Sequence, residues 1–287
     1  MEKISEVSCI IPTMDGREHL LMKLLWSMPT GCEKIIVRDM DILLAAKRNK
    51  GARAAKGEYL LFIDDDNHLL PGAIEKALAV AKLEKVGVVG LMACYHDRVN
   101  YVADGGSKRN YLTGFTKGVN TNAHWPSISK EPYEVDEVAN AFMVHCELFY
   151  ELHGFDEKNF PIDLDEADLC KRIKNLGYKV MMCPTAVCFH HSQTYSPIPD
   201  FRRPLNAYFM GRNRQRFQRI NLNALSYWVY LVIFCPIFIC FYSAALLYRK
   251  KPRMLWHFLR GVWDGTFGCF KNPYQPSICK KGGRISL

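Results

Sequence analysis

Acidic and polar residues suited to binding a metal or a diphosphate follow three short apolar runs near the N-terminus. The run VSCIIP leads into Pro12, Thr13 and Asp15, the run KIIVR ends before Asp39, and the run YLLFI is followed by Asp64–Asp66. Three adjacent carboxylates repel one another unless a cation compensates them. Hard divalent ions such as Mg²⁺ and Mn²⁺ take carboxylate oxygens and bridge to a diphosphate. The pattern favours a metal-assisted diphosphate site, and a simple polar turn is the alternative.

Apolar runs and helical patterns alternate around these acids. Strands are predicted over 7–12, 34–38, 59–63 and 86–92, and helices over 18–27, 43–56 and 71–83. This alternation is typical of an α/β fold, with a mostly parallel sheet that is covered by helices on both faces. Ligands of such sheets bind outside the carboxyl ends of the strands, so we expect the acids to meet at one edge. The sequence has no glycine-rich phosphate loop, which argues against a dinucleotide enzyme or a P-loop NTPase.

The charge of the chain is divided unevenly. The 287 residues carry a formal charge of +9, but residues 1–200 have 23 Lys and Arg against 28 Asp and Glu. Residues 201–287 have 15 Lys and Arg against the single acid Asp264. Nearly half of the residues are apolar, so the chain is neither disordered, nor collagen-like, nor a bare coiled coil. The basic character belongs to the C-terminal third.

That third contains 24 residues without a charge, from Leu225 to Tyr248. The stretch is long enough to cross a hydrocarbon layer about 30 Å thick, and Pro236 near its middle predicts a kink. We therefore expect a transmembrane or re-entrant helix, with a buried core helix as the alternative. Basic residues flank both ends, so they do not decide its orientation.

The basic segments on either side favour a membrane over a nucleic acid. Arginines alternate with aromatics in Tyr208–Arg219, directly before the apolar stretch, where lipid phosphates are the expected partners. After the stretch, Pro252–Phe270 mixes apolar and basic residues like a helix in the plane of the interface. Packing of that helix on the catalytic domain is the alternative.

The N-terminus lacks the features of a secretory signal, and the eleven cysteines show no CxxC pairing. Both observations favour a cytosolic face and reduced, buried thiols for residues 1–200. The expected organisation is a catalytic domain at 1–205, a basic juxtamembrane segment at 206–224, the membrane helix at 225–248 and a basic tail at 249–287.

Four segments closely resemble the family 2 glycosyltransferases, and they follow the order of that family. They are VSCIIPTMDGREHL, AAKRNKGARAAKGEYLLFIDDDN, ANAFMVHCELFYELHGFDEKNF and IDLDEADLCKRIKNLGYKVMMCPTAVCFHH. The resemblance covers most of residues 5–200. It implies the GT-A fold and a membrane-anchored enzyme similar to rhamnosyl- and glucosyltransferases.

The resemblance also implies a role for individual residues. Those that would bind the nucleotide-sugar are Pro12, Thr13, Asp15, Asp39, Arg48, Asp64 and Asp65. Asp66 would be the direct ligand of Mg²⁺ or Mn²⁺, with Asp64 and His190 beside it. Asn140 and Ala141 fall at the acceptor-facing floor, although Asn140 departs from the Gly-Ala that is usual there.

The catalytic base corresponds to the second acid of the family's Glu-Asp-x-Asp motif. Here the order is reversed to Asp165-Glu166. Position assigns the base to Glu166, and Asp165 is the alternative. Acids at a helix start also complement the helix dipole, and both roles are compatible. In an inverting transfer such a base removes the proton of the acceptor hydroxyl as its oxygen attacks the sugar.

The expected protein is thus a membrane-bound, metal-dependent, inverting glycosyltransferase. Its partners would be a nucleotide-diphosphate sugar and a lipid-linked or other glycan acceptor, with no nucleic acid. Polysaccharide assembly and protein glycosylation are the expected settings. A polyprenyl-phosphate sugar synthase is the rival, and a catalytically inactive membrane-bound binding protein or nucleic-acid binder represents a different class.

Overall fold

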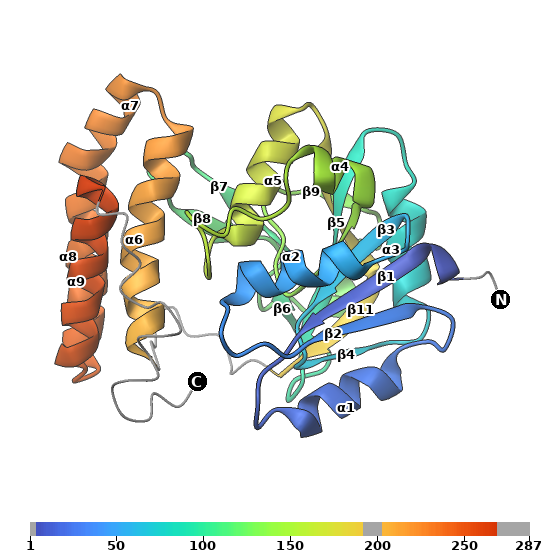
Figure 1. Cartoon of the computed structure of the whole chain (residues 1–287). Coiled ribbons are helices and arrows are strands. Elements are labelled where there is room, and N and C mark those ends of the chain that lie inside the picture. The colour runs from blue at the N-terminus through green and yellow to red at the C-terminus, as the bar shows by residue number, and fades with distance from the viewer. Residues whose placement is uncertain (1–3, 192–202, 269–287) are drawn as a thin grey trace.

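The computed structural model describes residues 4–191 and 203–268. Two helical layers cover a nine-stranded sheet, and three further helices stand beside it (Figure 1). The main path of the sheet has the order β2-β1-β3-β10-β5-β11-β4. These strands are β1 (Val7–Pro12), β2 (Glu33–Val37), β3 (Tyr59–Ile63), β4 (Asn67–Leu69), β5 (Val86–Tyr95), β10 (Ala141–His145) and β11 (Lys179–His190). Two short strands complete this sheet, β6 (Val102–Asp104) beside β5 and β9 (Tyr133–Glu134) beside β11, and β7 (Ser107–Arg109) and β8 (Thr116–Gly118) form a separate two-stranded sheet.

The sheet is parallel where the sequence predicted it and is interrupted by one reversed strand. Strands β2, β1 and β3 are parallel neighbours, and β5 is parallel to β11. Strand β10 lies between β3 and β5 and is antiparallel to both. The three strands that precede the acids therefore point the same way, and their carboxyl ends meet at one edge, as expected.

Buried residues of successive strands alternate between two helical layers. Leu61 of β3 packs toward α1 (Glu18–Ser27) and α3 (Ala73–Ala81). Its neighbour Phe62 packs toward α2 (Leu44–Ala54), α4 (Cys146–Glu151) and α5 (Asp165–Asn175). A strand that is buried on both faces has to be apolar throughout, which explains the continuous runs that the sequence shows.

Residues 204–267 form helices that pack against one another. Helix α6 (Pro204–Asn221) lies against the α/β domain, and α7 (Ala224–Val229), α8 (Cys235–Tyr248) and α9 (Pro252–Phe267) pack beside it (Figure 1). A π-type turn at Tyr230–Phe234 joins α7 to α8 just before Pro236, so the apolar stretch is one continuous helix, Ala224–Tyr248. By its length and composition, that helix could cross a membrane.

Three of the four arginines that we expected at lipid phosphates lie inside the protein, whereas Arg219 is exposed. Arg212, Arg214 and Arg216 are at most 8% exposed. Arg212 donates hydrogen bonds to the main-chain carbonyls of Asn159 and Lys158 at 2.9 and 3.0 Å. The expectation failed because these guanidinium groups satisfy carbonyls of the domain loops, which a sequence pattern does not reveal. They dock α6 onto the α/β domain.

Candidate functional site

The carboxyl ends of β1 and β3 are joined through their polar side chains. Thr13 Oγ1 donates a hydrogen bond of 2.6 Å to Asp65 Oδ2. Lys47 Nζ, from α2, donates to the main-chain oxygen of Thr13 at 2.8 Å. Thr13 and Asp65 thus lie together at the strand-end edge, as the sequence predicted. The ammonium group of Lys47 lies beside them.

The protein's own cations compensate the aspartate triplet. Arg17 Nη2 lies 2.7 Å from both Asp65 Oδ1 and Asp66 Oδ2. His190, at the end of β11, places Nε2 3.2 Å from Asp66 Oδ1. Burial raises the pKa of Asp66, but the hydrogen bond and charge of His190, helped by Arg17, outweigh it and lower that pKa to about 2. Asp66 is therefore ionised at any physiological pH. We first argued for a metal because three adjacent carboxylates need a compensating cation. Arg17 and His190 already provide positive charge, so this argument alone does not require a metal.

Arg48 connects the triplet with the acids of α5. Its Nη1 contacts Asp165 Oδ2 at 2.6 Å and Glu166 Oε1 at 2.8 Å, and its Nη2 contacts Asp64 Oδ1 at 3.1 Å. The guanidinium is fully buried and lies 5.5 Å from the centre of the Phe155 ring. We expected Arg48 near a nucleotide base. The structure shows its guanidinium buried and in contact with three carboxylates, and its place near a nucleotide base stays a prediction.

Burial distinguishes the two candidate bases. The Asp165 side chain is fully buried, whereas 16% of the Glu166 side chain is exposed. Burial, and then the charge of Glu166, raise the pKa of Asp165 well above its ordinary value. Burial also favours neutral Glu166, but the charge of Arg48 and the hydrogen bonds from Asp165 and Arg48 lower its pKa. Of the two, Glu166 is the accessible and ionised carboxylate.

Two left-handed residues set the start of α5. Asp163 has φ 64° and Leu164 has φ 61°, and the helix begins at the next residue. Aspartate adopts this region more readily than most residues, whereas leucine is strained there. The turn aims the first turn of α5, with its acids, at the strand-end edge. Burial, and then the charge of Glu166, raise the pKa of Asp163 to about 7.

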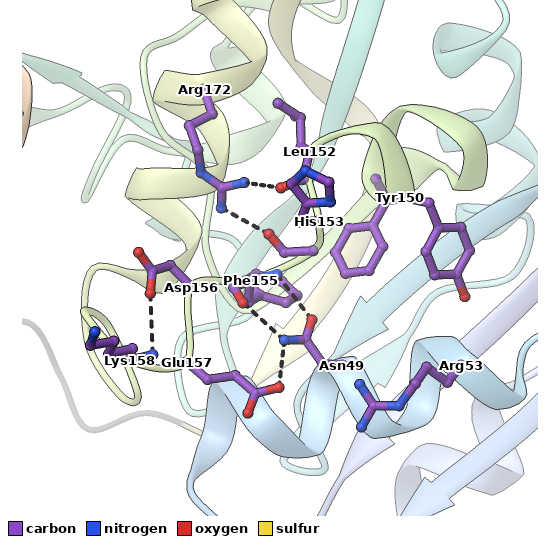
Figure 2. A pocket seen from close by; sticks show the side chains of 12 residues that line it. Asn49, Arg53, Tyr150, Leu152, His153, Phe155, Asp156, Glu157, Lys158 and Arg172 are labelled. Carbon is purple, nitrogen blue, oxygen red and sulfur yellow. Dashed lines mark hydrogen bonds between the residues drawn. The ribbon is translucent and has the colours of Figure 1, made fainter.

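Asn49 fixes the other end of the loop that leads to α5. Its Nδ2 donates to the main-chain oxygen of Phe155 at 2.9 Å and to Glu157 Oε1 at 2.8 Å, and its Oδ1 accepts from the Phe155 N–H at 2.9 Å (Figure 2). These residues line an open pocket of about 740 Å³, which Arg172 also borders. Neighbouring residues of α2, Arg48 and Asn49, therefore hold both ends of the segment that leads to Glu166.

The remaining nucleotide candidates are spread along the same edge. Asp39, after β2, accepts hydrogen bonds from Lys50 Nζ at 2.7 Å and from the Asp41 N–H at 3.1 Å. The bond from Lys50 lowers the pKa of Asp39. Asp15 is 70% exposed, 4.0 Å from Arg38, and Pro12 ends β1. These groups are open to a ligand.

The two acceptor-side candidates differ. Asn140 has φ 63°, its carbonyl accepts from the Asp64 N–H at 3.0 Å, and its Nδ2 donates to Asp104 Oδ2 at 3.1 Å. It supports the triplet from the neighbouring strand. Ala141 is fully buried in the sheet core, so its side chain does not line a subsite.

The donor set suits a divalent ion that is completed by its substrate. Within residues 4–191 and 203–268, no group of three or more His, Cys, Asp and Glu side chains is arranged to hold a metal. Asp66 Oδ1 is buried without a full hydrogen-bond partner and faces His190 Nε2. Mg²⁺ and Mn²⁺ in nucleotide enzymes use one or two protein ligands with phosphates and water. Asp66 and His190 fit that arrangement, while Asp64 is turned toward Arg48.

Sequence reasoning missed several residues of the site. Arg17, Lys47, Asn49, Asp104 and Asp163 all contact predicted site residues or lie beside them. Lys47 and Asn49 flank Arg48 in a segment that had been singled out, so proximity was a usable signal. No sequence pattern indicates that Asp104 contacts Asn140, because the two residues come together only when their strands are placed in the folded sheet.

Residues 32–127 match the profile described as "Glycosyl transferase family 2". This stretch of the chain is similar to that family. A curated "Uncharacterized glycosyltransferase" of Haemophilus influenzae is 34% identical over 76 residues, which are 26% of this chain and 25% of that protein. The chain thus spans about a quarter of the length of this relative.

Solved structures show the same fold. The mannosyltransferase PcManGT of Pyrobaculum calidifontis, in complex with GDP-Man and Mn²⁺, is similar with a TM-score of 0.55 and 14% identity, over 92% of this chain and 87% of that one. GalNAc-T7 with UDP, GalNAc and Mn²⁺ is similar with a TM-score of 0.53 and 14% identity, over 96% of this chain and 59% of that one. The α/β fold is therefore the GT-A fold, as expected.

Proposed function

We propose that the protein is an inverting glycosyltransferase that moves a sugar from a nucleotide-diphosphate sugar to an acceptor hydroxyl. One observation carries this proposal. Arg48 holds the accessible carboxylate of Glu166 and the strand-end carboxylate of Asp64 in one cluster, with contacts of 2.8 and 3.1 Å. A proton acceptor and a diphosphate-binding edge thus lie on the same side of the sheet, as such a transfer requires.

The donor would bind along the strand-end edge. Asp15, Asp39 and Thr13 present polar atoms there, and Arg17 and Lys47 add positive charge beside the triplet. The polar atoms of Asp15, Asp39 and Thr13 suit a nucleoside, and the positive charges of Arg17 and Lys47 suit a diphosphate. Complexes of similar folds with GDP-Man and with UDP support a donor of this class.

Asp66 and His190 would hold Mg²⁺ or Mn²⁺, whereas Asp64 contacts Arg48. When bound, such an ion stabilises the negative charge that develops on the leaving diphosphate. The protein contributes an ionised Asp66, because His190 and Arg17 keep its pKa low. The Mn²⁺ present in two complexes of similar folds supports this assignment.

Glu166 would act as the base. Because Arg48 lowers its pKa, Glu166 is ionised at neutral pH and accepts the proton that the acceptor oxygen loses as it attacks the sugar. Asp165, fully buried against Arg48, would orient this pair rather than touch substrate.

A lipid-linked or glycan acceptor at a membrane suits the C-terminal helices, with the catalytic domain on the cytosolic face. Support comes from the uncharged helix Ala224–Tyr248 and its basic flanks. Assembly of surface polysaccharides or protein-linked glycans would use such an enzyme.

A donor panel and the variant Glu166→Gln test the proposal. We expect Mn²⁺-dependent hydrolysis or transfer with one of the UDP-, GDP- or dTDP-sugars, and a loss of roughly a thousandfold in transfer for Glu166→Gln. Nucleotide binding, measured by calorimetry, should be unchanged. Glu151→Gln, an exposed acid on α4, is the control.

Retained transfer in Glu166→Gln would favour a phosphate acceptor, as in a polyprenyl-phosphate sugar synthase, because a phosphate needs no base. Absence of any metal-dependent nucleotide binding would favour a binding protein without activity.

A further inference from the structure

The helices α7, α8 and α9 present a continuous apolar surface on the side away from the α/β domain. Leu225 and Trp228 are 76% and 64% exposed, and no charged residue occurs between positions 225 and 248. We call this surface the outer apolar face, and its large exposed residues are Leu225, Trp228, Val232, Ile233, Ile237, Phe241, Leu247, Tyr248, Trp256, Leu259, Trp263 and Phe267. Soluble proteins do not leave an apolar surface of this extent in water, so something covers it.

The opposite face of the same helix is packed against protein. Tyr230, Phe238 and Leu246 are buried in a cluster with Phe258 of α9. Cys235 Sγ approaches Gln215 Oε1 of α6 at 3.5 Å. The apolar helix therefore runs along α6 and α9 instead of leaving the molecule (Figure 1).

The middle of this helix also lies close to the α/β domain. Arg214 of α6 places its guanidinium 4.1 Å from the ring centre of Phe238 and 4.7 Å from that of Phe115, in the loop between β7 and β8. One side chain thus separates the centre of the apolar stretch from a domain loop.

This packing conflicts with a membrane crossing. If Ala224–Tyr248 ran across a bilayer, Phe238 would lie near its midplane, and the loop with Phe115 would lie at the same depth. Exposed polar backbone and charges such as Lys117 of β8 would then enter the hydrocarbon. Irregular, lipid-exposed backbone and unpaired charges are strongly unfavourable there.

We propose that the outer apolar face lies flat on an anionic lipid bilayer, with α7, α8 and α9 in the plane of its surface and no crossing. Tryptophans at Trp228, Trp256 and Trp263 suit the headgroup boundary. Basic residues at the turn from α8 to α9 and along α9 are placed to contact lipid phosphates: Arg249, Lys250, Lys251, Arg253 and Arg260. This inference rests on the membrane association in the proposed function and is independent of sugar transfer.

Lipid is favoured over a second copy of the chain as the occupant. On α9 the exposed positions alternate between cations and tryptophans, as Arg253, Trp256, Arg260 and Trp263 show. A symmetric pairing of two copies through this face would bring these cations together, whereas anionic headgroups would neutralise them.

Vesicle flotation of the full chain tests the occupant. Vesicles of phosphatidylcholine and phosphatidylglycerol should bind the protein, and Trp228→Asp should weaken partitioning by about tenfold or more. Trp26→Asp is the matched control, because Trp26 on α1 is 77% exposed on the α/β domain. Equal loss in both variants, or a stable dimer that ignores vesicles, would overturn the proposal.

Cysteine labelling tests the orientation. Cys240, Cys269 and Cys279 are changed to Ser, and single cysteines are introduced as Ala224→Cys, Lys250→Cys and, in the α/β domain, Glu84→Cys. In sealed membrane vesicles, an impermeant maleimide should label all three positions from the same side. Labelling of positions 224 and 250 from opposite sides would show a crossing and refute the in-plane orientation. Donor hydrolysis in detergent, measured in parallel, reports on the proposed function separately.

Discussion

A single guanidinium controls the ionisation of the proposed catalytic acids. Arg48 and Asp165 are fully buried, and the partly exposed Asp64 and Glu166 contact the same guanidinium, so three carboxylates share one cation. Burial raises the pKa of Asp64 to about 6, even though Arg48 opposes this. One cation cannot compensate three carboxylates, so the cluster retains a proton on its most buried members. Glu166 keeps its charge because the charge of Arg48 and the hydrogen bonds from Asp165 and Arg48 lower its pKa.

Arg48→Lys should separate positioning from binding. Lysine keeps the positive charge but loses the planar contacts to several acids, so kcat should fall roughly tenfold to a hundredfold while donor KM changes less. Because Arg48 lowers the pKa of Glu166, the acidic limb of the kcat–pH profile should move to higher pH. A loss of kcat with an unchanged profile would mean that Arg48 has only a structural role.

Asp163 should make stability depend on pH. Burial raises its folded-state pKa to about 7, above the unfolded value of about 3.9. Between these values the folded protein binds a proton that the unfolded chain has released, so the free energy of unfolding should fall as pH rises from 4 through 7. Asp163→Asn, which tolerates φ 64°, should flatten this dependence. Thermal unfolding from pH 4.5 to 8 measures it, and an equally steep decline in the variant would contradict the assignment.

The sequence could locate some site residues but not their contacts. Strand ends are visible as apolar runs that stop at polar residues, which is why Thr13 and Asp65 were found. Arg17 was missed because its role depends on the loop after β1 folding back over the triplet. The burial of Arg48 was missed for the same kind of reason, since it requires α5 to close from more than a hundred residues away.

At the scale of elements, local sequence patterns predicted where helices and strands lie in the chain better than they predicted which strands are adjacent in the sheet. Strand β1 and helix α1 have the predicted bounds, and α2 and α3 differ by one or two residues at their ends. The reversed strand β10 between β3 and β5 was not predicted, because strand order depends on contacts distant in sequence. The lipid-binding role predicted for the arginines of α6 was wrong for the same reason. A sequence of alternating arginines and aromatics is the same whether these residues contact lipid or protein.

The loop before α5 should depend on Asn49. Asn49→Ala removes three hydrogen bonds to Phe155 and Glu157 and leaves buried backbone groups without partners, so we expect a loss of about 1–3 kcal/mol in stability. Denaturant unfolding measures this, with the exposed Asn175→Ala on α5 as control. Equal stability of the two variants would show that the loop is held elsewhere.

The crossing of α6 and α9 should depend on glycine. A Cβ on Gly261 would lie 2.0 Å from the main-chain oxygen of Tyr208, so the helices could not keep their separation. Alanine gains about 1 kcal/mol in helix propensity, yet the overlap should outweigh it and leave Gly261→Ala destabilised by about 1–3 kcal/mol. Gly31→Ala, with no atom nearer than 4.0 Å, is the control. A melting temperature of Gly261→Ala at or above that of the unsubstituted protein would contradict the packing.

At the scale of the whole molecule, α6 joins the apolar helices to the loop before α5, which carries the proposed base. Asn213 Nδ2 donates to the main-chain oxygens of Ile162 and Asp163 at 2.6 and 2.9 Å, directly before the turn that aims Glu166. The other side of α6 packs on α8 and α9. The helices that contact lipid in our proposal therefore also support the position of the base.

Two variants should separate these roles. Asn213→Ala should lower kcat by about threefold to tenfold, because small displacements of a base reduce rate steeply, and leave vesicle binding unchanged. Trp228→Asp should weaken vesicle binding and leave kcat on a water-soluble acceptor unchanged, since Trp228 faces away from the α/β domain. Flotation and steady-state assays of both proteins measure the four quantities. If Trp228→Asp lowered kcat in detergent as much as Asn213→Ala does, the apolar helices and the base would form one mechanical unit, and lipid contact would itself have to be treated as part of catalysis.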